Sequence, residues 1–278
     1  TSTDKPNAES NAAVNIANVR SHIKTLASDE FLGRGPLTEG ETLTFNYLAD
    51  EYKKLGLSGS FNGEFLQPVT MAKLTPDQNM TLQVGDLSFN AGSDFTARTQ
   101  QINPEINIDG SDVVFVGYGI NAPEYNWDDF ADIDVKDKTI IVLVNDPGFA
   151  TQDDALFTGN AMTYYGRWTY KYEEGARQGA KAVFIVHETA PAAYPWGVVE
   201  SSNTGSKYTL IDQDKNASDI PVMGWIDEQA ANEIFAQAGL DYQTEKANAL
   251  KADFKPVDLK AKAALTLKSD ISQAQSYN

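Results

Sequence analysis

The sequence predicts an α+β fold from three observations. Residues 168–179 carry aromatic and small side chains at helical spacing, and Gly179 is a typical position for a helix to end. The apolar run 182–186 follows within a few residues and is typical of a buried strand. Further apolar runs at 112–118 and 139–144 predict strands of the same sheet. A helix that leads directly into a buried strand is the repeating unit of an α/β layer.

Composition excludes several classes of protein. The 278 residues allow one or two domains. The formal net charge of −17 disfavours binding to nucleic acid or to anionic lipid, so we expect neither as a partner. The absence of cysteine excludes disulfides, thiolate metal sites and cysteine nucleophiles. No apolar run is long enough to predict a membrane span.

The first part of the chain predicts a polar tail and two helices. Residues 1–11 are interpreted as a disordered lead-in, of the kind that often follows a removed export signal. Residues 15–27 predict an amphipathic helix. Thr38 and Glu41 predict a capping box at the start of a second helix, which we expect to end at Gly56. Two helices cannot bury their apolar faces against each other alone, so an exposed hydrophobic patch is expected.

The remaining segments alternate between strand and turn patterns. Asp227 predicts the N-cap of a further helix, ending at Gly239. The aspartates between 128 and 137 are interpreted as an exposed turn beside a buried Trp127 and Phe130, with a cation site as the alternative. The other predicted segments are a strand at 65–71, a hairpin at 80–89 with its turn at 85–86, a turn at 145–148, a loop at 195–219, a strand at 220–226 whose proline suggests an edge or a strand start, and a half-exposed strand at 257–267.

The chain predicts no catalytic residue. Its two histidines are His22, on the first helix, and His187, at a predicted strand end. His187 and the following glutamate begin like a zinc-protease helix motif, but position 191 is proline where the motif needs a second histidine. No Gly-x-Ser-x-Gly element supports a serine nucleophile.

A weak calcium motif lies at Asp212, Asp214 and Asn216, whose alternating oxygens resemble the start of a calcium loop. The motif then departs from the pattern, because Ala217 stands where glycine is needed and Met223 where glutamate is needed. These residues are calcium candidates, with a solvated loop as the alternative.

An aromatic cluster with one arginine is the most site-like feature. Tyr164, Tyr165, Arg167 and Trp168 could bind the side chains or carboxylate of a peptide, and Trp196 could join them from a loop. The alternative is that the aromatic residues pack between helix and sheet. Arg167 is the residue that core packing explains least.

Several stretches, taken in order, resemble one family. Residues 26–35 (LASDEFLGRG), the second helix and 65–69 (FLQPV) resemble the amino-terminal part of exported zinc aminopeptidases, the group that includes aminopeptidase Y and glutamate carboxypeptidase II. The segments 112–119, 138–147 and 173–183 resemble the protease-associated domain inserted in many members. The resemblance covers nearly all of the chain after its tail.

The resemblance implies a division of the chain. Residues 12–75 would be the helical amino-terminal segment of the peptidase, 76–256 the β-rich protease-associated domain, a β/α sandwich-barrel, and 257–278 a strand returning towards a missing catalytic domain. In the family, that catalytic domain holds two zinc ions, starting from a His-x-Asp pair. This sequence contains no His-x-Asp, so zinc is expected only in a full-length parent, with no cofactor in this chain.

The resemblance also implies a function. The chain would be the non-catalytic portion of an α/β zinc aminopeptidase, inactive alone, which covers the active site and modulates access of peptide substrate. Its partners would be the missing catalytic domain and the peptide, and its location the periplasm or the exterior, after removal of a signal. The alternatives are a stand-alone peptide- or ligand-binding module without enzymatic activity, and a calcium-stabilised adhesion domain.

Overall fold

The computed structural model describes residues 14–278, which divide into two compact units. Unit 1 holds residues 14–71 together with Ala274–Asn278, and unit 2 holds Ala72–Gln273. These divisions fall at 71/72 and 273/274, whereas the sequence placed domain boundaries at 75/76 and 256/257. Within the described residues, no helix is long and apolar enough to cross a membrane.

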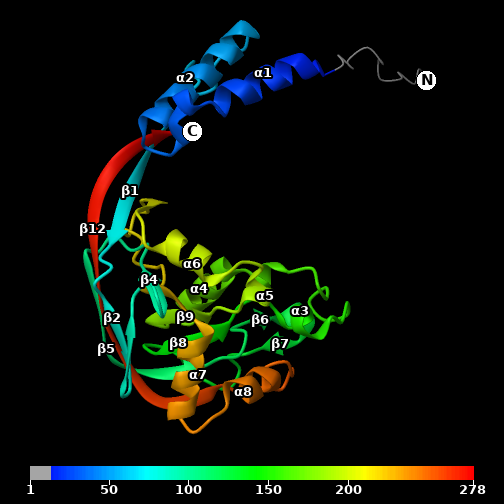
Figure 1. Ribbon diagram of the computed structural model, residues 1–278, viewed down its shortest axis with the longest axis vertical. Coiled ribbons are helices and arrows are strands. Elements are labelled where there is room, and N and C mark those ends of the chain that lie inside the picture. Colours follow the sequence, from blue (N-terminus) through cyan, green and yellow to red (C-terminus); the bar gives the residue numbers. More distant parts are fainter. Residues whose placement is uncertain (1–13) are drawn as a thin grey trace, which may run out of the picture. The chain divides into compact units, whose positions relative to one another are not determined.

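Unit 1 is built mainly from helices (Figure 1). The predicted first helix is confirmed as α1, Ile16–Leu26, and Asn15 caps it by accepting a hydrogen bond from the amide of Ala17 at 2.9 Å. The 3-10 segment η1, Asp29–Arg34, leads into α2, Glu39–Lys54. Both helices therefore form where the apolar periodicity placed them.

The two ends of α2 differ in how well the sequence predicted them. The expected capping box is wrong, because Glu41 Oε2 accepts the amide of Leu37 at 2.9 Å and the Thr38 hydroxyl donates to Gly35 O. The predicted end is confirmed. Gly56 has φ +74°, and the amide of Leu57 donates to Tyr52 O at 3.1 Å. This is a Schellman motif, which needs a left-handed residue at that position.

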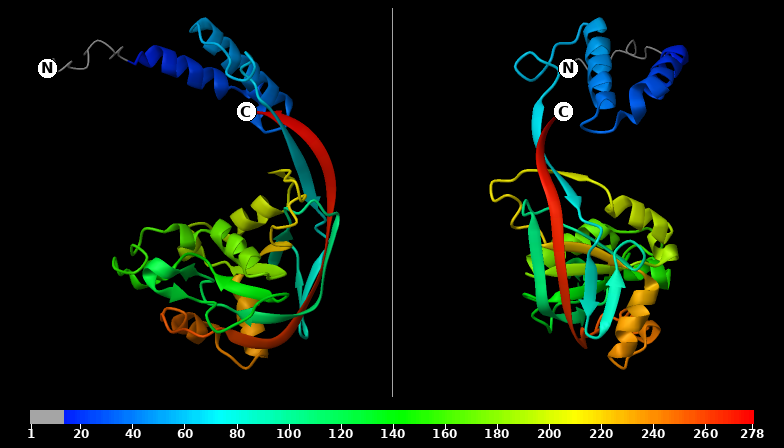
Figure 2. Two further views of the ribbon diagram at one scale, coloured as in Figure 1. Left: turned by 180° about the vertical axis from the view of Figure 1, so that it is seen from behind. Right: turned by 60° about the vertical axis from the view of Figure 1, so that its left-hand side comes forward.

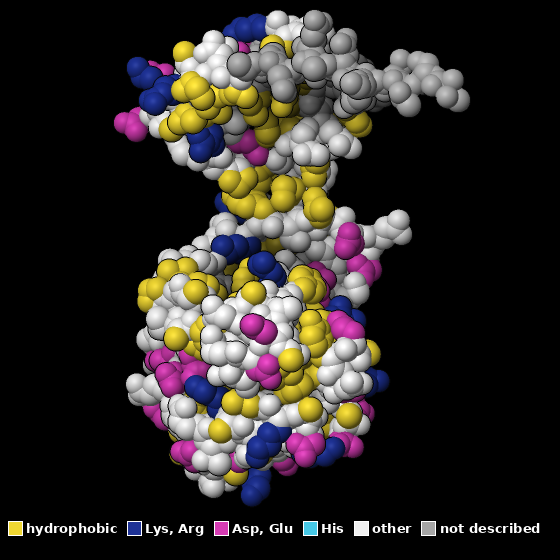
Figure 3. Space-filling view, turned by 90° about the vertical axis from the view of Figure 1, so that its right-hand side faces the viewer, with side chains coloured by type: hydrophobic (Ala, Val, Ile, Leu, Met, Phe, Trp, Pro, Cys, Tyr) yellow, Lys and Arg dark blue, Asp and Glu magenta, His cyan; other side chains and the backbone are white. Residues whose placement is uncertain are grey.

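The apolar side chains of unit 1 are largely exposed, as expected. Helix α1 has no buried residue, and in unit 1 only Phe31, Gly40 and Ser276 are buried among the residues described. Figure 3 shows hydrophobic side chains at the surface of this unit. The exposed large apolar residues include Ile16, Val19, Ile23, Leu48, Tyr52, Leu55 and Leu57. The apolar side chains of the two helices are thus exposed within the described residues of unit 1.

Unit 2 is organised around a mixed sheet. Among the described residues its ten strands run in the order β10-β1-β12-β5-β8-β9-β11-β4, and the β2–β3 hairpin pairs with β12. The strands β5, β8, β9 and β11 are parallel neighbours, whereas β4 and β12 are antiparallel to theirs. The bounds are β1 Pro68–Pro76, β2 Thr81–Val84, β3 Leu87–Asn90, β4 Phe95–Arg98, β5 Glu105–Phe115, β8 Thr139–Leu143, β9 Ala182–Val186, β10 Lys207–Leu210, β11 Val222–Ile226 and β12 Val257–Tyr277. Figure 2 shows β5 and the hairpin on either side of β12. A separate pair joins β6, Asn121–Ala122, to β7, Trp127–Asp128.

Helices cover both faces of the parallel strands (Figure 1). Alternate residues of each strand belong to two apolar cores, so that Phe184 packs on one face and Ile185 on the other. Helices α7 and α8 lie on the first face, and α4 and α6 on the second. The helices of unit 2 are η2 Pro123–Tyr125, α3 Pro147–Thr151, η3 Tyr164–Gly166, α4 Trp168–Arg177, α5 Thr189–Ala192, α6 Trp196–Asn203, α7 Glu228–Gln237 and α8 Tyr242–Asn248. The fold class is thus α+β, as predicted.

The central prediction holds in detail. Helix α4 runs to Arg177 with Gln178 as its C-cap, and Gly179, with φ +74°, is the left-handed residue that follows, as predicted. Strand β9 covers the predicted residues 182–186. The hairpin forms with its two-residue turn, because Val84 pairs with Leu87. Asp227 caps α7 by accepting the amide of Ala230 at 2.7 Å.

Three local predictions are wrong. The strand expected at 65–71 begins only at Pro68, and the turn at 145–148 opens the short helix α3. The loop expected at 195–219 contains α6 and β10. Of the two alternatives for Pro221, the strand start is confirmed, because β11 begins at Val222, and the edge is not, because β11 lies between β9 and β4. The acidic turn has one buried member, Asp129, which accepts hydrogen bonds from Trp127 Nε1 and from the amide of Ile120.

Candidate binding site

The predicted aromatic cluster is divided by the structure. Tyr164 and Tyr165 belong to η3, directly before α4, and their hydroxyls donate to carboxylates of the chain itself. Tyr164 donates to Glu173 at 2.7 Å and Tyr165 to Glu124 at 2.5 Å. The ring of Tyr165 also packs edge-on against Phe157, at 6.0 Å between centroids. These two tyrosines therefore contribute to the structure of the α4 region.

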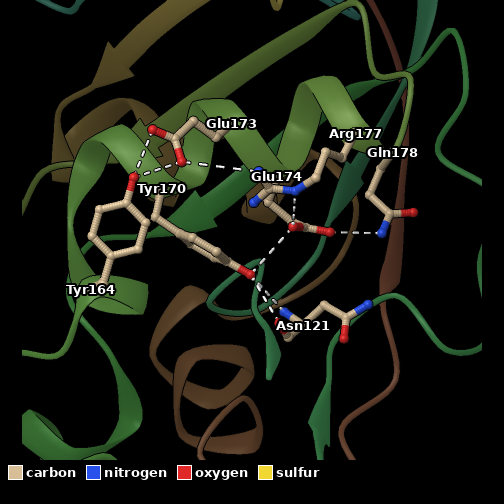
Figure 4. A network of polar contacts seen from close by, with 7 residues as sticks. All are labelled: Asn121, Tyr164, Tyr170, Glu173, Glu174, Arg177 and Gln178. Carbon is tan, nitrogen blue, oxygen red and sulfur yellow. Dashed lines mark hydrogen bonds and ion pairs between the residues drawn. The ribbon is translucent and has the colours of Figure 1, made fainter. Parts of the chain in front are cut away.

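The carboxylates around α4 form a connected network, which Figure 4 shows. Glu174 accepts hydrogen bonds from Arg177 Nε at 2.8 Å and from Gln178 Nε2 at 2.8 Å. Tyr170 contacts Glu174 at 3.4 Å and donates to Asn121 O at 3.1 Å. The network fixes α4 to the β6 segment and leaves Arg177 paired with acids.

Arg167 is exposed and starts α4 as its N-cap. Within residues 14–278 its guanidinium forms no hydrogen bond or ion pair. It does not line the cavity that its neighbour Trp168 lines.

Trp168 lines a cavity of about 310 Å³ at one edge of unit 2. The walls come from β4, α4, α6, β10 and β11. The lining includes three aromatic side chains, two positively charged side chains, one serine and one asparagine. The lining residues are Arg98, Trp168, Tyr194, Val198, Val199, Ser202, Asn203, Lys207 and Trp225. Concave sites with apolar walls and a few polar groups are typical of small-ligand binding.

Two positively charged side chains, Arg98 and Lys207, line the cavity. Arg98 is only 9% exposed, and its Nε donates to Asn203 Oδ1 at 3.1 Å. Burial lowers the pKa of the Arg98 guanidinium, which stays protonated because arginine ionises so far above neutrality. The pKa of Lys207 is also lowered, first by burial and then by repulsion from Arg98. Neither forms an ion pair within the described part of the chain, and the lining holds no Asp or Glu.

Sequence reasoning missed both cations. Arg98 ends the buried strand β4, so the available signal was a charged residue closing an otherwise buried run. Lys207 lies in the segment predicted as a loop, where a lysine attracts no attention. Their proximity depends on β10 and β4 meeting around α6, which no local pattern encodes.

Trp196 lies elsewhere. Its Nε1 donates to Gly92 O at 2.8 Å, and its ring meets His187 edge-on, with 5.6 Å between centroids. His187 is buried at the end of β9, as expected, and its Nε2 lies 2.9 Å from Tyr194 O. Trp196 therefore supports the loop that carries Tyr194 and does not line the cavity.

A second cavity, of about 460 Å³, lies where β8, β9 and β11 end. Its lining is acidic, with Asp146, Glu188 and Glu228, and the one lysine there, Lys246, pairs with Glu188. Asp146 is buried and accepts hydrogen bonds from the Thr163 amide and hydroxyl. These contacts give most of the polar groups a partner within the chain.

Lys171 is a buried lysine close to this second cavity. It is 1% exposed, and its Nζ donates to Tyr118 O at 2.6 Å and to Asn145 O at 2.9 Å. Burial lowers its pKa to about 7, against attraction from Asp129 and Asp146. Burial likewise raises the pKa of Asp129 to about 7.

The calcium candidates face their own loop. Asp214 accepts the amides of Asn216 and Ser218, each at 2.9 Å, and Asn216 Oδ1 accepts the amide of Asp212 at 2.9 Å. Among residues 14–278, no three His, Cys, Asp or Glu side chains come together to hold a metal ion. The calcium interpretation stays a prediction that these contacts do not favour.

Comparison with known proteins finds one distant likeness of note. No protein-family model matches the chain, and no curated protein sequence does. A solved structure, the aminopeptidase from Aneurinibacillus sp. strain AM-1, is 18% identical, with a TM-score of 0.42. The match covers 95% of this chain and 46% of that one, so the chain spans less than half of its neighbour.

Proposed function

We propose that this chain is the non-catalytic portion of a zinc aminopeptidase, comprising its amino-terminal segment and its protease-associated domain. The observation that carries the proposal is the exposed apolar surface of α1 and α2. An apolar surface of this kind is stabilised when a partner covers it. The family that the sequence resembles supplies the partner, namely the catalytic peptidase domain of the same protein.

The proposal assigns zinc to that partner. The donor groups of the described residues do not fit a zinc site, because no three His, Cys, Asp or Glu side chains converge in residues 14–278. We therefore derive no catalytic step through this chain. Its proposed role is to cover the active site and to modulate access of peptides. The family resemblance supports an exported protein, in the periplasm or outside the cell.

Aminopeptidase activity tests the proposal. The complete protein encoded by the gene and the present chain are assayed side by side on an aminoacyl-anilide, with zinc added and after chelation. We expect zinc-dependent hydrolysis by the complete protein and none by the chain. Activity of the chain alone would overturn the proposal, and so would an inactive complete protein that has bound zinc.

A stand-alone binding module is the second candidate function. The cationic cavity favours it, since Arg98 and Lys207 have no acidic partner in the described residues. A complete protein without any peptidase activity would favour this function over the first.

A further inference from the structure

The cavity around Arg98 places two positive charges against aromatic walls in a strongly acidic protein. The chain has 39 acidic residues against 22 basic ones. The lysines and arginines that form ion pairs mostly do so at the surface, as Lys262 does with Asp112. Arg98 and Lys207 instead share one cavity in the absence of a lining carboxylate. Arg98 is 9% exposed, whereas Lys207 is only partly buried. A low-dielectric surrounding strengthens the attraction of the Arg98 charge for an anion in the cavity.

The protein itself satisfies only part of the arginine. Asn203 takes the hydrogen bond of Nε, and Asn203 is held in turn by its own bond to Val199 O at 2.7 Å. Within residues 14–278 the terminal guanidinium nitrogens donate no hydrogen bond. Asn203 anchors Nε, and the terminal nitrogens of Arg98, which lines the cavity, remain available to a bidentate acceptor.

The rest of the cavity lining indicates the chemical nature of the ligand that would carry the anionic group. Trp168, Tyr194 and Trp225 give aromatic surfaces, and Val198 and Val199 extend them. A volume of about 310 Å³ is at the small end of the range for ligand sites, so it suits a ligand the size of one amino acid. Flat groups pack well between aromatic side chains.

We propose that this cavity binds a small carboxylate carrying an aromatic or apolar group, such as an N-acylated amino acid or the carboxyl-terminal residue of a peptide. Arg98 holds the carboxylate through its terminal nitrogens, Lys207 adds a second positive charge, and Trp168 and Trp225 enclose the apolar group. The site is separate from any peptidase chemistry and exists whether or not the proposed function is right.

Binding of N-acetyl-L-tyrosine tests this inference, with N-acetyl-L-tyrosinamide as the matched ligand without a carboxylate. Calorimetry measures the affinity, and tryptophan fluorescence reports occupancy because two of the four tryptophans line the cavity. We expect the acid to bind about tenfold or more tightly than the amide, the difference typical of a charge-assisted pair.

Three variants locate the binding. Lys207→Gln and Arg167→Gln each remove one positive charge, but only Lys207 lines the cavity. We expect Lys207→Gln to weaken binding by about threefold to tenfold and Arg167→Gln to leave it unchanged. Arg98→Gln should abolish the preference for the acid over the amide. Should that variant fold poorly, Trp168→Ala tests the aromatic wall instead, because Trp168 is 41% exposed, and it should weaken binding of both ligands.

Three results would overturn the inference. The first is equal affinity for the acid and the amide, and the second is an equal effect of Lys207→Gln and Arg167→Gln. The third is displacement of the ligand by inorganic phosphate at the same concentration as by a second aromatic carboxylate, which would make the cavity a general anion site.

Discussion

Lys171 and Arg98 are two buried cations with different partners. Two backbone carbonyls accept from Lys171 Nζ, whereas one side-chain amide accepts from Arg98. Burial lowers the pKa of Lys171 to about 7, so a substantial fraction of this lysine is neutral near pH 7. Arginine cannot lose its proton in this way. An arginine left without a carboxylate therefore points to a ligand, while such a lysine is explained by the protein alone.

The lowered pKa of Lys171 predicts how stability depends on pH. The unfolded chain binds a proton at Lys171 up to its ordinary value of 10.5, but the folded chain only up to about 7. Burial of Lys171 therefore costs no stability above pH 10.5, where the lysine is neutral in both states. The cost grows as the pH falls from 10.5 towards 7. Relative to Lys171→Met, the wild-type free energy of unfolding should rise by about 1.4 kcal/mol per pH unit above pH 7.

Urea unfolding at several pH values between 7 and 9.5 measures this difference. Lys251→Met is the control, because Lys251 is exposed and its replacement should keep the wild-type slope. Parallel curves for wild type and Lys171→Met would show that the lysine remains charged in the folded protein.

At the residue scale, sequence predicted chemistry less well than burial. In the aromatic cluster that the sequence singled out, the hydroxyls of Tyr164 and Tyr165 donate to Glu173 and Glu124. Those carboxylates lie 9 and 41 positions away in the chain. A pairing over such a separation is set by the tertiary fold, so a local motif cannot reveal it.

The elements of unit 2 follow local patterns closely where a strand is buried on both faces. The run 182–186 became β9 because five consecutive apolar residues fill both cores at once. Helix α6 was missed because Val199 is its one buried residue and glycine, serine and asparagine make up half of it. Its position depends on tertiary contacts such as that of Asn203 with Arg98.

The contact between α4 and β9 predicts opposite effects for two glycine substitutions. A Cβ at Gly175 would lie 2.3 Å from Val183 Cγ2, whereas a Cβ at Gly197 on α6 meets nothing within 4 Å. Gly175→Ala should destabilise the protein by about 1–3 kcal/mol through overpacking. Gly197→Ala should be neutral or stabilise it by up to about 1 kcal/mol, because alanine favours a helix.

Denaturant unfolding of both variants checks this pair. The substitution is chemically identical, so helix propensity alone would make both variants at least as stable as wild type. A stable Gly175→Ala variant would mean that α4 and β9 can separate without cost.

At the scale of the whole molecule, the two units differ in how much apolar core each of them contains. Unit 2 encloses two apolar cores on either side of its sheet, whereas unit 1 buries very few side chains. The sequence indicated this difference, because two amphipathic helices without a following partner cannot complete a core. The sequence could not indicate the cavity around Arg98 and Lys207, because five separate elements form its walls.

The exposed face of α1 gives a prediction for the complete protein. Ile23 is 61% exposed in this chain, and Ser21 is exposed on another side of the same helix. Ile23→Asp and Ser21→Asp add the same charge. In this chain both should change stability by less than about 0.5 kcal/mol, as surface substitutions do. In the complete protein, Ile23→Asp should destabilise by about 1–3 kcal/mol, because a covered apolar side chain would become a buried charge without a partner.

Thermal unfolding of the four proteins, two variants in each length of chain, measures the difference. The proposed docking of α1 requires that Ile23→Asp be harmful only in the complete protein and that Ser21→Asp be tolerated in both. If Ile23→Asp were tolerated in both, the proposed docking of α1 on a catalytic domain would be wrong. If it were harmful in both, Ile23 would be needed by unit 1 itself, and the exposed surface would no longer argue for a missing partner.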